Sequence, residues 1–172
     1  MKGTSTRPHT VLAVSVSTAL VLLTAGCSQD VHTGAAATAP AVSAAAPGQV
    51  SVRTSGADLT ITDAVAHLDR SGDGTLSMTV RNDDGVPEHL GMVATPDSGR
   101  GVLVGGKAAN GNGSLATAGI LLLSGTSVTF GGHGPRVLLH HVHGMTAEHT
   151  LPLALQFGVA GLVHFQARVA SS

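Results

Sequence analysis

Apolar residues recur at every second position in several short segments, and this alternation constrains the fold more than any other feature of the sequence. Two segments show it most clearly: Leu76, Met78 and Val80, and then Leu151, Leu153, Leu155 and Phe157. Residues two apart on a strand share a face, so each segment is expected to bury one face. Turn-forming pairs such as Asp73-Gly74 and Asp84-Gly85 separate the segments. After the N-terminal region no segment keeps a helical period, so the pattern predicts an all-β domain.

The alternating and β-branched segments predict ten strands. We expect them at residues 50–53, 59–68, 75–81, 89–95, 101–104, 119–123, 127–130, 136–141, 150–157 and 161–169. Many short strands that are separated by Gly, Asp and Asn are typical of a β-sandwich or a barrel.

The N-terminus has the composition of a secretion signal. Lys2 and Arg7 precede an apolar stretch from Val11 to Leu23 that contains no charged residue. A permanent transmembrane helix needs about 20 apolar residues, so this stretch is too short to be one. We therefore expect residues 1–26 to be a signal peptide and the chain to be exported.

The only cysteine of the chain, Cys27, directly follows the small residues Ala25 and Gly26. This ending resembles a lipobox, in which a diacylglyceryl group is attached to the cysteine before cleavage makes it the first residue. A lone cysteine cannot form an intramolecular disulfide, and lipid attachment gives it a role. We expect lipidation at Cys27, with palmitate-type acyl chains holding the protein extracytoplasmically on the cell membrane. The alternative is an ordinary cleavage region with an incidental thiol.

The mature chain is expected to have two parts. Residues 27–48 comprise the lipidated cysteine and a flexible tether rich in Ala, Pro, Ser and Thr, and residues 49–172 form one folded domain. Removing Lys2 and Arg7 from the nine basic residues leaves seven against ten acidic ones, a formal charge of −3. The mature chain has no basic cluster, Trp or Tyr, so we expect no nucleic-acid partner.

Motifs for nucleotide binding and catalysis are incomplete. The segment from Gly101 to Ala108 approximates a phosphate-binding loop, but Ala108 stands where a hydroxyl residue should bind Mg²⁺. There is no Gly-x-Ser-x-Gly or Ser-x-x-Lys motif. We therefore expect neither a nucleotide nor an enzymatic activity.

Histidines are concentrated near the C-terminal third of the chain. The candidate metal ligands are His133, His140, His141, His143 and Met145. Imidazole and thioether groups suit copper, and imidazole alone also suits zinc, which is the less favoured ion here. If the strand expected at 136–141 continues, His141 and His143 share a face and His140 points away. The alternative is a set of solvated surface histidines in a chain with few Lys and Arg residues.

The order of strands and turns resembles a known family. The segments that carry the resemblance are Leu59–His67, Val80–Asn82 with its Asp-Asp-Gly turn, Ala94–Pro96, Gly119–Leu122 before Ser124–Thr126, and Leu153–Phe157 with Val169. Over residues 59–169 the chain resembles the extracytoplasmic copper chaperones called PCu(A)C, also written PCuAC. The resemblance implies a cupredoxin-like, Greek-key β-sandwich.

The resemblance also implies a copper site, from which this sequence departs. Family members hold Cu(I) with a His and a Met, followed by a His-x-Met pair, and are associated with copper delivery to cytochrome oxidase. The corresponding positions here are Val104, Leu115, Val137 and Leu139, and a shift of one residue exchanges some of them for Gly105, Arg136 and Leu138. None of these side chains is a copper ligand, so the family's site is expected to be missing.

Two hypotheses about function follow. In the first, the chain is a membrane-anchored copper chaperone-like lipoprotein that binds copper at the relocated His/Met cluster and passes it to an envelope protein. Its affinity should then fall as pH drops through about 6 to 6.5, because protonated imidazoles do not bind metals. In the second, the chain is a metal-free β-sandwich that serves as an interaction module of the cell envelope.

Overall fold

The computed structural model describes residues 41–44, 46–106 and 111–171. All of them belong to one compact unit, Ala37–Ser172. The expected signal peptide, Cys27 and most of the expected tether lie outside the described residues, and these assignments remain predictions. Over the described ranges, no helix is long and apolar enough to cross a bilayer.

The described part of the chain forms twelve strands and no α-helix, which confirms the all-β prediction. The strands are β1 (Ala41–Ala44), β2 (Val50–Thr54), β3 (Ala57–Leu68), β4 (Gly74–Asn82), β5 (Glu88–Ala94), β6 (Arg100–Val104), β7 (Leu115–Ala116), β8 (Gly119–Leu122), β9 (Thr126–Phe130), β10 (Arg136–Leu139), β11 (Thr150–Phe157) and β12 (Leu162–Ser171). All ten expected strands are present, whereas β1 and β7 were not expected. β10 ends two residues before the expected end at residue 141.

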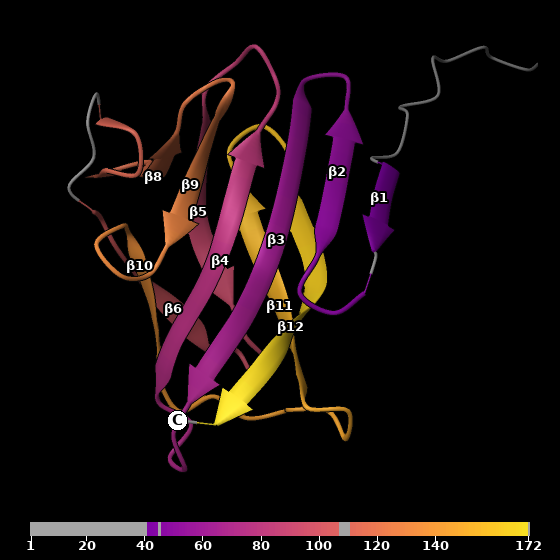
Figure 1. The fold of residues 1–172 in the computed structure, drawn as a ribbon, viewed down its shortest axis with the longest axis vertical. Coiled ribbons are helices and arrows are strands. Elements are labelled where there is room, and N and C mark those ends of the chain that lie inside the picture. The colour runs from indigo at the N-terminus through magenta and orange to yellow at the C-terminus, as the bar shows by residue number, and fades with distance from the viewer. Residues whose placement is uncertain (1–40, 45, 107–110, 172) are drawn as a thin grey trace, which may run out of the picture. The chain divides into compact units, whose positions relative to one another are not determined.

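Seven strands close into a barrel (Figure 1). The order β3-β12-β11-β5-β6-β10-β4 returns to β3, because β4 pairs with β3 as well as with β10. The β3–β12 pair is parallel, and the other pairs around the barrel are antiparallel. The strands β1 and β2 extend the sheet beside β3, and β8 and β9 add to β5 and β4. Closure leaves the seven barrel strands paired on both sides, so they present few free edges.

The barrel interior is the hydrophobic core. The alternation expected from the sequence is confirmed in β4 and β11, whose Leu76, Met78, Val80, Leu151, Leu153, Leu155 and Phe157 are all buried. Phe130 and Phe157 are the largest fully buried side chains. The described core residues run from Val50 to Ala167 and include positions on the strands beside the barrel as well as on the barrel itself.

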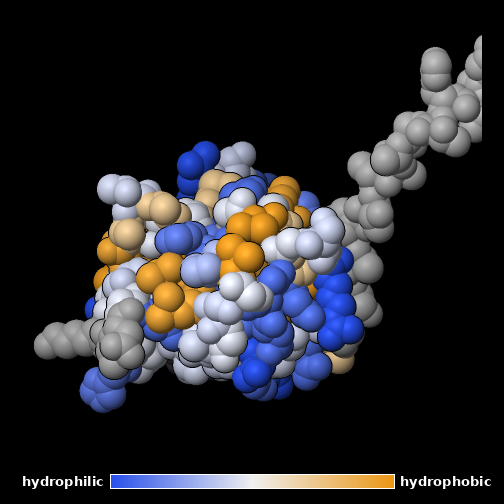
Figure 2. Space-filling model, turned by 90° about the horizontal axis from the view of Figure 1, so that it is seen from above, coloured by the Kyte–Doolittle hydropathy of each residue, from blue (hydrophilic) through white to orange (hydrophobic). Residues whose placement is uncertain are grey.

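The two ends of the barrel differ in their side chains. The lower end in Figure 1 carries the β3–β4, β5–β6 and β10–β11 connections. The upper end carries the β4–β5 and β11–β12 connections, and Figure 2 shows apolar side chains gathered there. Val86 and Val159, each 50% exposed, belong to these two upper connections. The β10–β11 connection at the lower end contains His140, His141 and His143.

Candidate functional site

The β10–β11 connection crosses the lower end of the barrel and is fastened to the β3–β4 loop. The amide of Val142 donates to the carbonyl of Gly72 at 2.9 Å. The amide of His141 donates to Oδ1 of Asp73 at 2.8 Å. These two bonds place the histidine-rich connection directly beside the acidic β3–β4 loop.

Asp69 orders the β3–β4 loop from within. Its Oδ1 accepts hydrogen bonds from the Ser71 amide at 2.8 Å, the Ser71 hydroxyl at 2.6 Å and the Asp73 amide at 3.0 Å. The hydroxyl of Ser71 and these amides hold the pKa of Asp69 below its ordinary value of 3.8. A carboxylate that accepts several hydrogen bonds stays ionised, so the loop keeps its negative charge at neutral pH.

Asp73 is the carboxylate of this loop that lies next to the histidines. The Nδ1 atoms of His140 and His141 each lie 3.7 Å from its Oδ1. The backbone hydrogen bond from His141 is the main cause that lowers the pKa of Asp73. Both imidazoles are exposed, with 57% and 78% of the side-chain surface accessible. Two adjacent histidines thus face one carboxylate while their outer edges meet solvent.

The backbone of His141 departs from the extended strand conformation that precedes it. Its φ angle is 49°, in the left-handed region that residues other than glycine adopt infrequently. The strand β10 has already ended at Leu139, so the alternation of faces does not continue to residue 143. The expectation that His140 points away from His141 is wrong, because both imidazoles face Asp73.

The remaining expected ligands lie in two other places. His143 and Met145 line a cavity of about 380 Å³ together with Arg70 and Val142, and Met145 is 53% exposed. His133 lies in the turn between β9 and β10, at the opposite end of β10 from His140. The structure therefore brings His140 and His141 together, keeps His143 and Met145 on the same connection, and separates His133 from them.

These groups do not form a complete metal site. Among the described residues, no three His, Asp, Glu or Cys side chains are arranged so that they could hold one ion. The arrangement at Asp73 is a pair of imidazoles with a carboxylate behind them. To bind a metal, the exposed imidazoles must rotate toward the ion or toward His143 and Met145, and exposed side chains change rotamer within nanoseconds.

The positions that correspond to the family's copper ligands are also in the described part. Val137 and Leu139 point into the core and are 0% exposed. Arg136 and Leu138 alternate with them and face outward, and Arg136 lies directly opposite Val104 on β6. In either register these residues do not fit copper, because aliphatic side chains offer no lone pair and a guanidinium carries a positive charge.

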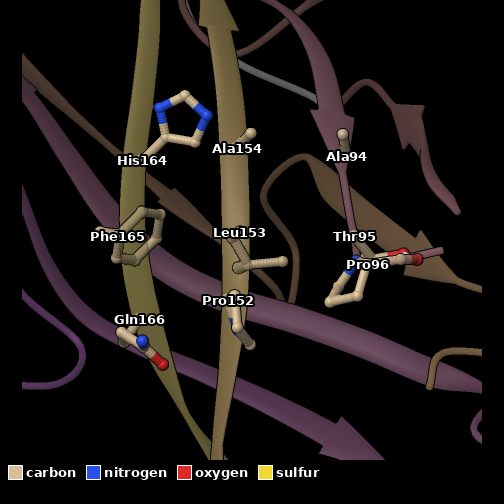
Figure 3. Close-up of a pocket in the computed structure, with 9 residues that line it drawn as sticks. All are labelled: Ala94, Thr95, Pro96, Pro152, Leu153, Ala154, His164, Phe165 and Gln166. Atoms are coloured by element: carbon tan, nitrogen blue, oxygen red, sulfur yellow. The ribbon is translucent and has the colours of Figure 1, made fainter. Parts of the chain in front are cut away.

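Another cavity lies on the outer surface of three neighbouring strands. It has a volume of about 420 Å³, and Figure 3 shows its lining side chains arising from β11, β12 and the end of β5. The small residues Ala94 and Ala154 lie opposite each other on paired strands and form its floor. His164 is its one imidazole, so this groove lacks the set of donors that a metal site needs.

Sequence reasoning missed the role of Asp69 and Asp73. Asp73-Gly74 was expected to be only a hairpin turn, and nothing in the local sequence shows that residue 73 meets residue 141. The hydrogen bond between them joins positions 68 residues apart. The pattern Asp69-x-Ser71-x-Asp73 was the available signal of an ordered acidic loop.

Comparisons with known proteins agree with this fold. No protein-family model matches the sequence, and no curated protein matches it. Among solved structures, the copper-bound PCuAC domain of PmoF2 is similar, with a TM-score of 0.51 and 23% identity over 66% of this chain and 93% of that domain. The apo PCuAC domain of PmoF1 has a TM-score of 0.53 and 19% identity over 66% and 94%. The apo PCuAC domain of PmoF2 has a TM-score of 0.53 and 24% identity over 66% and 90%.

These likenesses confirm the expected resemblance to PCuAC domains and the cupredoxin-like fold. At these identities they concern the fold alone. Function belongs to the residues of a site and not to the fold that carries them.

Proposed function

We propose that this chain is a lipid-anchored extracytoplasmic protein that binds copper at the lower end of its barrel and passes it to another envelope protein. His140 and His141 are the principal ligands, with His143 and Met145 on the same connection completing the coordination. The observation that carries the proposal is that two imidazoles place their Nδ1 atoms 3.7 Å from one carboxylate oxygen, Asp73 Oδ1. A fold similar to that of a copper-bound domain supports it.

The carboxylate behind the two imidazoles suits metal binding. Histidine ligands commonly direct the ring N–H that does not bind metal at a carboxylate, which fixes the tautomer and makes the other nitrogen a better donor. Here Nδ1 of both rings faces Asp73, so Nε2 of each ring is left for an ion. Imidazole nitrogens and the Met145 thioether are ligands that copper accepts. His133 lies too far along β10 to join this set.

Exposure of the site suits a carrier more than a storage protein. His140, His141 and Met145 are all more than half exposed. An acceptor protein can therefore reach the bound ion without opening the barrel. The absence of a preformed three-ligand group among the described residues is consistent with modest, reversible affinity.

Competition titration with Cu(I) tests the proposal, with Zn²⁺ measured in parallel. The protein is residues 28–172, which include the whole described core. We expect one-to-one Cu(I) binding that is lost in the variant His140→Ala/His141→Ala/His143→Ala. The matched control His67→Ala/His89→Ala/His164→Ala removes the same number of histidines and should bind as the wild type does. If neither metal binds more tightly than about 10 μM, the copper proposal is wrong.

Membrane attachment has a separate test. In cells, the protein should fractionate with the membrane and incorporate labelled palmitate, and Cys27→Ser should abolish both. A Cys27→Ser protein that remains in the membrane fraction would show that something other than the lipid holds it there.

A second function, a metal-free interaction module, is favoured by the apolar surface at the other end of the barrel. Val86 and Val159 are half exposed there, and Figure 2 shows apolar side chains gathered at this end of the barrel. Exposed apolar patches often mark protein interfaces. This function would be favoured if the copper titration fails and if Val86→Ser/Val159→Ser captures less of an envelope protein than the wild-type domain does.

A further inference from the structure

A second cavity, away from the histidine-rich connection, has the chemistry of an anion site. It has a volume of about 380 Å³ and lies between the end of β6 and the β9–β10 turn. Its lining residues are Gly105, Gly106, Gly132, His133, Gly134 and Arg136. No carboxylate is among them. The described wall of this cavity therefore combines one permanent cation, one imidazole and exposed glycine backbone.

Within the described ranges, Arg136 is a cation without an acidic partner. Arg53, Arg81 and Arg168 each approach a carboxylate within 4.0 Å. Among the described residues, no acidic side chain forms such a pair with Arg136. A guanidinium presents several N–H donors in a planar fork that matches two oxygens of a phosphate or carboxylate. Arg136 lies on the outer face of β10, opposite the aliphatic Val104.

The cavity wall is fixed by backbone contacts. The amide of Gly131 donates to the Pro135 carbonyl at 2.8 Å, and the amide of Gly134 donates to the Gly131 carbonyl at 3.0 Å. Gly106 packs so closely on Gly134 that a Cβ at Gly106 would lie 2.6 Å from the Gly134 carbonyl carbon. A wall that is already ordered loses little entropy when a ligand binds.

We infer that this cavity binds a phosphate-type oxyanion, with Arg136 as the bidentate donor and His133 as a second donor. The inference is independent of copper binding, because it uses neither the β10–β11 connection nor Asp73. His133, which is not part of the proposed copper site, would then contact an oxyanion instead of a metal ion. The shared ligand chemistry is phosphate, whose source is either the free ion or a lipid headgroup at the membrane.

Calorimetric titration of residues 28–172 with inorganic phosphate tests the inference. We expect saturable binding that weakens at least tenfold in Arg136→Gln and partly in Arg136→Lys, which keeps the charge but loses the fork. Arg100→Gln is the matched control, because Arg100 is an exposed arginine on β6 that does not line this cavity. The control should bind within about twofold of the wild type. Thermal unfolding of each variant checks that the barrel is intact.

A vesicle arm identifies the source of the phosphate. Flotation is compared for phosphatidylcholine vesicles with and without phosphatidic acid, using the same unlipidated proteins. Arg136-dependent flotation with phosphatidic acid supports a headgroup ligand, and phosphate binding without flotation supports the free ion. The inference is overturned if the wild type shows neither, up to about 10 mM phosphate, or if Arg136→Gln and Arg100→Gln weaken binding equally.

Discussion

His141 combines a strained backbone with a hydrogen bond that offsets the strain. Its φ of 49° is uncommon for a residue with a side chain, and its amide donates to Asp73. Residues held in this region cluster at functional sites, where the surrounding contacts determine them. At this residue the hydrogen bond to Asp73 both stabilises the backbone and turns the imidazole toward the carboxylate. The local geometry of the proposed copper site therefore depends on one acidic residue of another loop.

The acidic loop should make stability depend on pH in the acid range. Hydrogen bonds lower the pKa of Asp69 from 3.8, chiefly through the Ser71 hydroxyl, and a folded pKa below the unfolded one adds stability above the unfolded value. That contribution is lost as pH falls through about 4 toward the folded pKa. We expect Asp69→Asn to lower the melting temperature at pH 7 and to have little effect at pH 3.

The exposed turn residue Asp97 provides a control for this measurement. Asp97→Asn should leave the melting temperature close to that of the wild type at both pH values. A destabilisation by Asp69→Asn that is equally large at pH 3 and pH 7 would contradict an electrostatic origin.

Glu88 is the buried acid that fastens the upper end of the barrel. It is 3% exposed, and its carboxylate accepts hydrogen bonds from the amides of His89, Gly158, Val159 and Ala160. Replacing it with Ala removes the carboxylate that these amides share, although the Gly158 amide keeps its bond to the His89 carbonyl. We expect Glu88→Ala to reduce the free energy of unfolding by about 2–4 kcal/mol, measured by urea denaturation.

The exposed Glu148 is the comparison for Glu88. Glu148→Ala should leave the free energy of unfolding close to that of the wild type. A small effect of Glu88→Ala would show that water can enter and replace the carboxylate.

At the scale of elements, the alternation of faces along β10 determines which side chains occupy the positions aligned with the copper ligands of PCuAC domains. Its alternation sends Val137 and Leu139 into the core and Arg136 and Leu138 outward beside β6. The positions first aligned with the family's His-x-Met pair are therefore core positions. If the alignment is shifted by one residue, the pair becomes Arg136 and Leu138, which face outward on the same side as Val104.

This register makes an engineered site testable. In a background that carries His140→Ala/His141→Ala/His143→Ala, we expect Val104→His/Leu115→Met/Arg136→His/Leu138→Met to gain Cu(I) binding tighter than about 10 μM. The barrel should stay folded, because these four side chains are partly or fully exposed. Competition titration and thermal unfolding measure the two effects.

The other register is the control. This design carries Val137→His and Leu139→Met in place of the changes at Arg136 and Leu138. Because it puts an imidazole into the core, it should destabilise the barrel by at least about 3 kcal/mol. Equal stability and equal Cu(I) binding of the two designs would contradict the assignment of faces on β10.

Sequence patterns could predict most strands but not where their patterns break. Strands such as β4 and β11 keep one buried face from end to end, so their alternation was visible. In β3 the register shifts between Thr62 and Val65, with Asp63 at a φ of 54°, so the buried set passes from Ile61 to Ala64. That bulge, like the end of β10 at Leu139, is imposed by contacts with distant segments, such as the bond from Ala64 N to the Gly48 carbonyl.

The candidate site was predictable to a similar extent. The density of histidines identified the right connection, because ligand types can be read directly from sequence. Which of them face each other depends on Asp73, which lies 68 residues from His141. Because that contact cannot be read from the sequence, a strand continued past Leu139 predicted the pair His141 and His143 instead of His140 and His141.

At the scale of the whole molecule, the closed barrel separates three surfaces. The lower end presents the histidines and Asp73, the β6–β10 side presents Arg136, and the upper end presents apolar residues (Figures 1 and 2). Because the barrel strands are paired on both sides, a change at one surface need not disturb the others.

The most direct test of this account is the position of copper in a crystal of the loaded domain, residues 28–172, located by anomalous diffraction at the copper edge. The account predicts one strong peak beside Nε2 of His140 and His141, within about 2 Å of each nitrogen, and none in the His140→Ala/His141→Ala/His143→Ala variant. A peak beside Val104 and Arg136, or no peak at a protein site under saturating Cu(I), would contradict it.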